Sequence, residues 1–475
     1  MYPLGRKSHK EYDSDTASLI RQFAAADNFR SAKVEELELS GDYFRRPLRS
    51  EDLAFIDFGV PVVAETICDL PSLAAQRILR CIYDMQTAGL PRNGDLQALQ
   101  RRADFYSDQN RIEGARLESF LEGFAFGFLE EPPVDRDVTA ASLCKDFERY
   151  LREAQTFART LAIHFQSSFS KPNLRFVLVQ NGCLGLANRL AIDRARAAGF
   201  FDVLPHESGR PPEICRIGNG LENLMVAMDV NTATNRFWQF YLPTTLAAMN
   251  YLSGLATRPG RSLAMIGATF IAAIEWQSFV WMARKVGEAI SSDESKADDC
   301  ELTRTAADAM RRFEQALSAV EAALGRPGCE ELSRGVRAAG RLAQLSHQDL
   351  ETQLRWLAGI DDYVEIARRV SDRIRVDQVN IARDTFVEPR EMCSTTHVHN
   401  DNRLVVIESG AMVFWGCPDM RYQMKPGDMI LVPRGRLHGS AVTSDQCIYH
   451  QPIIPEEWVR PLIDEVDRRH DWPVH

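Results

Sequence analysis

Two blocks of sequence near the C-terminus decide the fold of that part of the chain. The first reads TTHVHNDNR at residues 395–403, and the second reads GDMILVPRGRLH at residues 427–438. Short apolar runs adjoin them at residues 404–407, 411–415 and 447–450. Because such runs are bounded by Gly, Pro and Asp, they predict the strands of a small β-barrel or jelly roll.

The histidines of these blocks have the spacing of metal ligands. His397 and His399 are two residues apart, so on a strand both side chains point to the same face, here the barrel interior. The Pro433–Gly435 turn brings His438 in from a neighbouring strand. Three neutral imidazoles that converge on one point suit a divalent transition metal such as iron, manganese, nickel, copper or zinc.

The two blocks resemble the two cupin motifs. The second fits fully, with Gly427, five residues, Pro433-x-Gly435, two residues and His438. The first departs from the usual pattern, because Arg403 and Leu404 stand where many cupins have a glutamate ligand. The resemblance therefore predicts a three-histidine centre without a carboxylate. The alternative is a barrel that has lost its metal and only binds a ligand. Arg403, which could repel a cation or point to solvent, does not decide between the two.

Composition limits the class of protein. A chain of 475 residues suggests two to four domains. The net charge of −10 argues against a general nucleic-acid binder. The chain contains no run of eighteen apolar residues, so we expect no membrane span. The first ten residues are polar and basic and contain no apolar signal core. Ten scattered cysteines without a CxxC pair fit reduced thiols, so we expect a cytoplasmic protein.

The first 372 residues read as helical and divide near the loop at residues 130–137. We expect a helical domain at 1–135, a second helical domain at 136–372 and the barrel domain at 373–475. Helical periodicity is clear at the following ranges: 73–85, 114–129, 146–159, 235–252, 262–290 and 302–369, the last interrupted at 325–328. The stretch 262–290 is nearly apolar on all sides, which predicts the central helix of a bundle.

Over nearly its full length the chain resembles the N-nitrosourea-forming multidomain metalloenzymes of streptozotocin biosynthesis. The resemblance implies a multidomain α+β fold, in which two all-α domains, the second haem-oxygenase-like, precede a C-terminal cupin β-barrel. It also implies a homodimer through the helical domains. The stretches that carry it are RRPLR at 45–49, FAFGFL at 124–129, RFWQFYL at 236–242, VEPR at 387–390, THVH at 396–399, RLHG at 436–439 and SDQCIY at 444–449.

The resemblance assigns roles to residues of the barrel. It implies that His397, His399 and His438 hold one Fe(II) per chain, with dioxygen as co-substrate. It also places Arg390 and Tyr449 along the pocket, where Arg390 would pair with a substrate carboxylate and Tyr449 would hydrogen-bond a reacting oxygen. A salt bridge at the barrel rim and an inward core tyrosine are the alternatives for these two.

The helical domain departs from that family. There a di-iron site, built on a Glu with a His ten residues later and on a His-x-x-x-Asp-x-x-His helix, hydroxylates the guanidine of a methylated arginine. Here Glu213 is followed ten residues later by Asn223, and Asp299 is the one remnant of the later helix. No histidine occurs between His206 and His347. We therefore expect a degenerate di-iron site, with Glu213 and Asp299 solvated or capping, and structural roles for the following histidines: His164, His206 and His347.

These observations predict an iron-dependent cupin oxidoreductase whose substrate has already been N-hydroxylated by a separate enzyme. The substrate would be an arginine-type guanidine, and the product would carry an N–N bond as an N-nitroso or diazeniumdiolate group. Two rival classes stay open. One is a cupin dioxygenase that acts on another small amino acid or a thiol, and the other is a non-catalytic binding protein.

Overall fold

The structure is a computed structural model, and its described residues are 13–26, 29, 46–48, 53, 56–87, 100, 103–104, 107–130, 139–205, 210–212, 219–230, 237–290, 299–378, 381–390 and 396–469. The chain forms two compact units. The barrel unit comprises residues 1–125, 235–243 and 349–475, and the helical unit comprises 126–234 and 244–348. The expected division into three domains stays a prediction, as does the haem-oxygenase likeness of the second.

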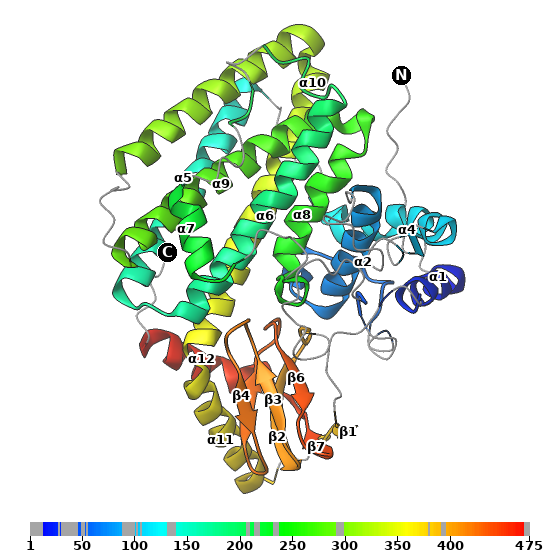
Figure 1. Ribbon diagram of the computed structural model, residues 1–475, viewed down its shortest axis with the longest axis vertical. Helices are drawn as coiled ribbons and strands as arrows, with labels where there is room; N and C mark the ends of the chain where they lie inside the picture. The colour runs from blue at the N-terminus through cyan, green and yellow to red at the C-terminus, as the bar shows by residue number, and fades with distance from the viewer. Residues whose placement is uncertain are drawn as a thin grey trace. The chain divides into compact units, whose positions relative to one another are not determined.

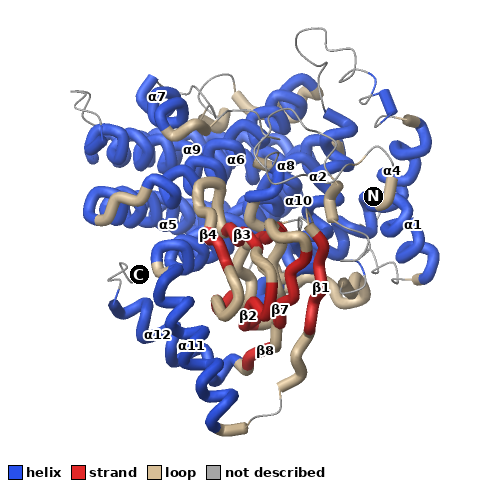
Figure 2. The backbone as a smooth tube through the Cα atoms, turned by 60° about the horizontal axis from the view of Figure 1, so that its bottom comes forward, coloured by secondary structure: helices blue, strands red, loops and turns tan. Residues whose placement is uncertain are grey.

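The strands of the barrel unit form two antiparallel sheets (Figure 2). One sheet has the order β1-β7-β2-β5, with β8 paired to β2, and the other has the order β4-β3-β6. The helical region followed by strands confirms the expected α+β class. The strands are β1 (Thr385–Pro389), β2 (Asn402–Ser409), β3 (Met412–Trp415), β4 (Tyr422–Met424), β5 (Met429–Val432), β6 (Gly439–Val442), β7 (Gln446–His450) and β8 (Ile453–Ile454).

Register decides which side chains of the larger sheet share a face. Tyr449 on β7 lies opposite both Phe386 on β1 and Ile407 on β2. The rings of Phe386 and Tyr449 stack with centroids 5.2 Å apart, and Ile407 is fully buried. Since residues directly opposite one another in a sheet point to the same side, these three build one apolar layer of the barrel.

Two helices flank the strands. Helix α11 (Ile360–Val376) packs on β5, and α12 (Glu456–Arg469) packs on α11. Figure 1 shows both helices beside the strands. The guanidinium of Arg373 lies 3.9 Å from the ring centre of Trp458, which adds a cation–π contact between them. Helix α12 was not predicted from the sequence.

The N-terminal part of the barrel unit is helical, as expected. Its elements are α1 (Ser14–Ala24), the 3-10 turn η3 (Ala64–Thr66), α2 (Leu70–Thr87), α4 (Asp108–Phe126) and the later 3-10 turn η6 (Trp238–Phe240). The hydroxyl of Tyr83 on α2 donates a 2.6 Å hydrogen bond to Glu122 on α4. The predicted helices at 73–85 and 114–129 are therefore confirmed, except that residues 127–129 form the 3-10 turn η5 (Gly127–Leu129).

The helical unit is a bundle whose central member is α9 (Ser262–Ile290), against which α5, α6 and α7 pack. The stretch Pro259–Ala289 is long and apolar enough to cross a membrane, but 78% of its apolar window is buried. That burial confirms the expected core helix. The other elements are α5 (Ala140–Ser167), α6 (Lys171–Ala197), α7 (Asn219–Ala227), α8 (Pro243–Ala256), the 3-10 turn η7 (Pro259–Arg261) and α10 (Asp299–Ala358), whose residues from Asp349 on belong to the barrel unit.

Glycines allow α9 and α10 to approach closely. A Cβ atom on Gly267 would lie 2.3 Å from the carbonyl oxygen of Leu332, and one on Gly335 would lie 1.9 Å from that of Ala264. Both distances are below van der Waals contact, so any side chain there would force the two backbones apart.

Two helix boundaries differ from the sequence analysis. The stretch 235–252 is not one helix: η6 ends before Tyr241, and α8 begins at Pro243. Proline suits the first helical position, because its missing N–H has no partner there, but it is unfavourable inside a helix. The break expected at 325–328 is confirmed by Gly325, whose φ of 61° interrupts α10. A second break at Gly359 separates α10 from α11.

Candidate metal centre

Three histidine side chains converge in the barrel unit. One ring nitrogen from each of His397, His399 and His438 lies within 4.8 Å of the others, and the ring centroids are 4.5 to 4.8 Å apart. The backbones of His397 and His438 exchange hydrogen bonds of 2.7 and 2.9 Å. We expected His397 and His399 on a strand; instead they lie in the segment before β2, where His397 forms an isolated bridge with His438.

A tight turn presents His438, as the sequence predicts. Gly435 has a φ of +74°, which is favourable for glycine because it has no Cβ. Its N–H donates to the carbonyl of His399 at 2.9 Å, and the N–H of Arg436 donates to that of Pro433 at 3.2 Å. The turn thus fixes the segment of His438 directly against the segment of His399.

The ring nitrogens are arranged as a metal site requires. His438 Nδ1 lies 2.8 Å from the carbonyl oxygen of Arg436, which assigns the proton to Nδ1 and leaves the Nε2 lone pair free. The Nε2 atoms of His399 and His438 are buried and have no hydrogen-bond partner. An orphaned buried nitrogen is costly unless something binds it, so these donors fit a divalent transition metal.

The environment keeps two of these imidazoles neutral. Burial, together with the neighbouring histidines, lowers the pKa of His399 well below 6.5; the Arg403 charge contributes less. Burial, followed by the charge of His397, lowers the pKa of His438 in the same direction. Both rings therefore present lone pairs at neutral pH.

These lowered pKa values predict an acid-sensitive fold. The unfolded chain takes up protons on His399 and His438 below their ordinary pKa of 6.5, whereas the folded chain does not. The stabilisation is therefore complete above that pKa and is lost as the pH falls toward the lowered values. We expect the urea midpoint of metal-free protein to decrease between about pH 7.5 and about pH 5. The decrease should be smaller in His438→Gln, and equal decreases in both proteins would contradict the prediction.

A second set of contacts fixes the segment before His397. The backbone N–H of Thr396 donates to the side-chain oxygen of Gln239 at 2.9 Å, and both residues are buried. The indole N–H of Trp415 donates to the Thr396 hydroxyl at 3.1 Å. Gln239 belongs to η6, so the stretch misread as a continuous helix supplies a residue to the site.

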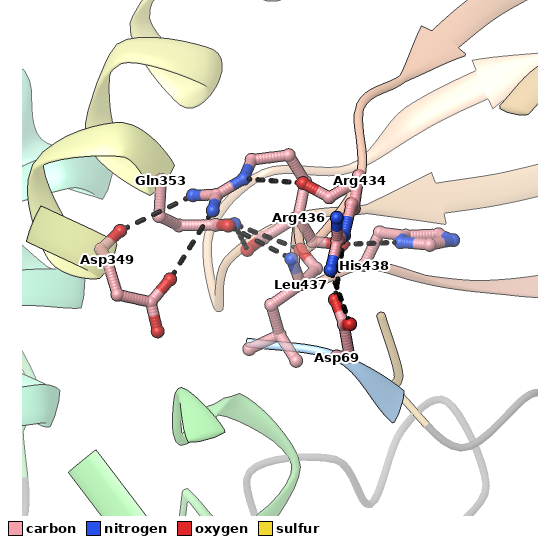
Figure 3. Close-up of polar contacts among 8 residues, drawn as sticks. Asp69, Asp349, Gln353, Arg434, Arg436, Leu437 and His438 are labelled. Atoms are coloured by element: carbon pink, nitrogen blue, oxygen red, sulfur yellow. Dashed lines mark hydrogen bonds and ion pairs between the residues drawn. The ribbon is translucent and has the colours of Figure 1, made fainter. Parts of the chain in front are cut away.

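Further side chains hold the turn that precedes His438 (Figure 3). Arg434 makes a bidentate ion pair with Asp69, at 2.9 and 2.5 Å. The side chain of Arg436 donates a hydrogen bond to the side chain of Asp349, and the side chain of Gln353 donates one to the backbone carbonyl of Leu437. The sequence reasoning missed all of these partners, because a lone polar residue in a helical stretch carries no local signal of the segment that it contacts.

Arg390 and Tyr449, the predicted pocket residues, have different surroundings. Arg390 directly follows β1; its side chain is 65% exposed and lies 3.4 Å from Asp445. Tyr449 is buried and stacks on Phe386. These positions match the alternatives of a rim ion pair and a core tyrosine, and the catalytic roles of both residues stay predictions.

Arg403 does not simply point to solvent. Its side chain is 18% exposed and donates to Asp384 at 2.8 Å and to the carbonyl of Gln451 at 3.1 Å. Asp401 lies 3.7 Å away. The guanidinium charge acts on His399, so a cation lies near the position that a glutamate ligand has in many cupins.

The expected di-iron remnants give no second centre among the described residues. Glu213 and His206 lie outside them, and so does the side chain of Asp299, the first residue of α10. Asn223 is exposed on α7. Within the described part of the chain, the barrel triad is the one group of three or more ligand side chains. The loss of the di-iron site stays a prediction.

The other two histidines of the helical unit have surroundings of their own. His347 Nε2 lies 2.8 Å from Glu275, and its ring stacks on Phe157. His164 is buried on α5, and burial lowers its pKa to about 4. These contacts support the expected structural roles.

Comparison with known proteins agrees with this geometry. The family model of the cupin domain matches residues 385–448, which contain all three histidines. The chain is also similar to nitrosourea synthase from Streptomyces achromogenes subsp. streptozoticus. The two are 24% identical over 434 residues, which cover 86% of this chain and 88% of that protein. The similarity therefore extends well beyond the barrel.

Proposed function

We propose that this chain is a cupin oxidoreductase that forms an N–N bond, with one Fe(II) per chain held by His397, His399 and His438. The observation that carries the proposal is the convergence of three imidazoles with two orphaned Nε2 atoms. The similarity to nitrosourea synthase along most of both chains supports the reaction type. Iron bound there would supply the one-electron chemistry that lets dioxygen oxidise an organic nitrogen compound.

The substrate in this proposal is an arginine-type guanidine that a separate N-hydroxylase has already modified. The exposed Asn223, where a ligand histidine would be needed, supports this choice. The product carries an N-nitroso or diazeniumdiolate group, and we propose that the chain acts in the cytoplasm as a homodimer. Tyr449 would hydrogen-bond a reacting oxygen, and Arg390 would exchange Asp445 for the substrate carboxylate.

The protein's own residues would do the positioning. The neutral imidazoles of His399 and His438 would hold the metal through their buried Nε2 atoms. Arg403 stands where many cupins have a glutamate ligand, so the chain offers no carboxylate ligand at that position, and its guanidinium is paired with Asp384 and Asp401.

The proposal predicts a sharp preference for N-hydroxylated substrates. Iron-loaded protein with dioxygen should convert Nω-hydroxyarginine, methylated or not, to a product with an N–N bond. The unmodified guanidines should react more slowly by a factor on the order of 10⁴, because groups arranged to hydrogen-bond the hydroxyl would be left unpaired. Mass spectrometry of ¹⁵N-labelled substrate measures both rates.

Controls separate the proposal from its rivals. Anaerobic samples and the His397→Ala, His438→Ala double variant should give no product. Equal conversion of unmodified arginine would mean that the helical unit hydroxylates, which would contradict the need for a separate N-hydroxylase. Oxidation of cysteine to its sulfinate, with no reaction of either guanidine, would support a thiol dioxygenase instead.

A further inference from the structure

A glutamine of helix α10 holds the residue next to His438. Gln353 is fully buried, and its amide nitrogen donates to the carbonyl of Leu437 at 3.0 Å. Its amide oxygen accepts from the N–H of the same residue, also at 3.0 Å. The amide nitrogen also lies 3.4 Å from the carbonyl oxygen of Gly416. One side chain thus satisfies both backbone groups of Leu437, as a neighbouring strand would.

A buried ion pair holds the preceding residue. Arg436 donates to the side chain of Asp349 at 3.4 Å and to its carbonyl oxygen at 3.3 Å. The side chain of Arg436 is 6% exposed and that of Asp349 is 0% exposed. Asp349 and Gln353 are four residues apart, so they lie on one face of α10 and contact consecutive residues of the turn.

These contacts affect His438 through the backbone carbonyl group of Arg436. The carbonyl of Arg436 accepts the hydrogen bond from His438 Nδ1 and so sets the direction of the ring. Figure 3 shows the Arg436 side chain extending toward α10 while the His438 ring extends the other way. Any rotation of the Arg436–Leu437 peptide would turn that carbonyl, and the imidazole with it.

We infer that Gln353 and Asp349 are positioning residues for the metal ligand His438. The inference rests on the proposed function only in that the triad binds a metal. Neither residue touches the imidazole; both fix the backbone whose carbonyl orients it. The last turns of α10 therefore determine metal affinity, although they precede the barrel strands in the chain.

Replacing Gln353 with methionine tests the inference, because methionine keeps the volume and removes all three hydrogen bonds. The control is Gln155→Met in α5, where a buried glutamine donates to the carbonyl of Leu302 at 3.0 Å. Cobalt(II) and zinc(II) are the probes, with full-length protein and a competing chromophoric chelator. We expect Gln353→Met to raise both metal dissociation constants about 10-fold or more, the usual effect of outer-shell partners of metal ligands.

A purely structural role of Gln353 would lower stability without changing metal affinity or the cobalt(II) spectrum. Gln353→Met should also shift the visible absorption bands of bound cobalt(II), whereas Gln155→Met should lower the urea midpoint without changing the bands or the affinity. Asp349→Asn, which keeps the shape of the side chain, should weaken cobalt(II) binding in the same direction. Unchanged affinity and spectra in Gln353→Met and Asp349→Asn would overturn the inference while leaving the metal centre intact. No metal binding in the wild type would overturn the metal centre itself, and this inference with it.

Discussion

The double variant His397→Ala, His438→Ala should contain no iron, whereas the wild type expressed with iron should contain about one iron per chain. Each imidazole supplies one of three donors, and one histidine alone cannot hold a transition metal against solvent and buffer ligands. Inductively coupled plasma mass spectrometry measures the number of iron ions per chain in both proteins. Product formation from N-hydroxylated arginines should disappear with the metal.

His347→Ala is the matched control for this experiment. His347 is largely buried like the triad, but its partners are Glu275 and Phe157, so its loss should leave the iron content unchanged. The same measurement tests the expected loss of the di-iron site. Two irons retained in the double variant would mean that the helical unit binds metal, and the chain would then need no separate N-hydroxylase.

Replacing Asp349 with alanine should destabilise the protein by about 3–5 kcal/mol, because it leaves the Arg436 guanidinium buried without its counter-charge. Asp349 is fully buried and Arg436 nearly so, and a buried unpaired charge is among the most costly single defects in a fold. Urea unfolding of metal-free protein measures this effect without any contribution from bound metal.

Two comparisons test whether the cost comes from the unpaired charge. The double variant Asp349→Leu, Arg436→Met removes both charges and should recover most of the stability. Asp69→Ala breaks the pair with Arg434, whose side chain is 47% exposed, so it should cost only about 1 kcal/mol or less. If Asp349→Ala and Asp69→Ala cost the same, burial of the first pair would not be the cause.

The fold of the barrel could be predicted from sequence because its signals are local. The apolar runs at 404–407, 411–415 and 447–450 correspond to β2, β3 and β7. A short apolar run between turn-forming residues predicts a strand, and this pattern does not depend on distant contacts. Helix α9 was predictable for a similar reason, since a helix that is apolar on nearly all sides is unfavourable in water and is typically the core helix of a bundle.

The stretch 235–252 shows where local reasoning fails. Its composition favours helix, but Pro243 starts α8 and the preceding residues turn away as η6. That turn is what places Gln239 against Thr396, 157 residues later in the chain. Pro243 marks that boundary locally, whereas the contact of Gln239 with Thr396 depends on a partner far along the chain.

The two histidine-containing blocks were enough to predict that His397, His399 and His438 converge, although the first two lie before β2 and not on a strand. How those imidazoles are held depends on contacts between residues that are far apart in the chain. Gln353 lies 84 residues before Leu437, and Asp349 lies 87 before Arg436. Hydrogen bonds between such distant residues depend on how helices and strands pack, and local sequence patterns do not show which segments pack together.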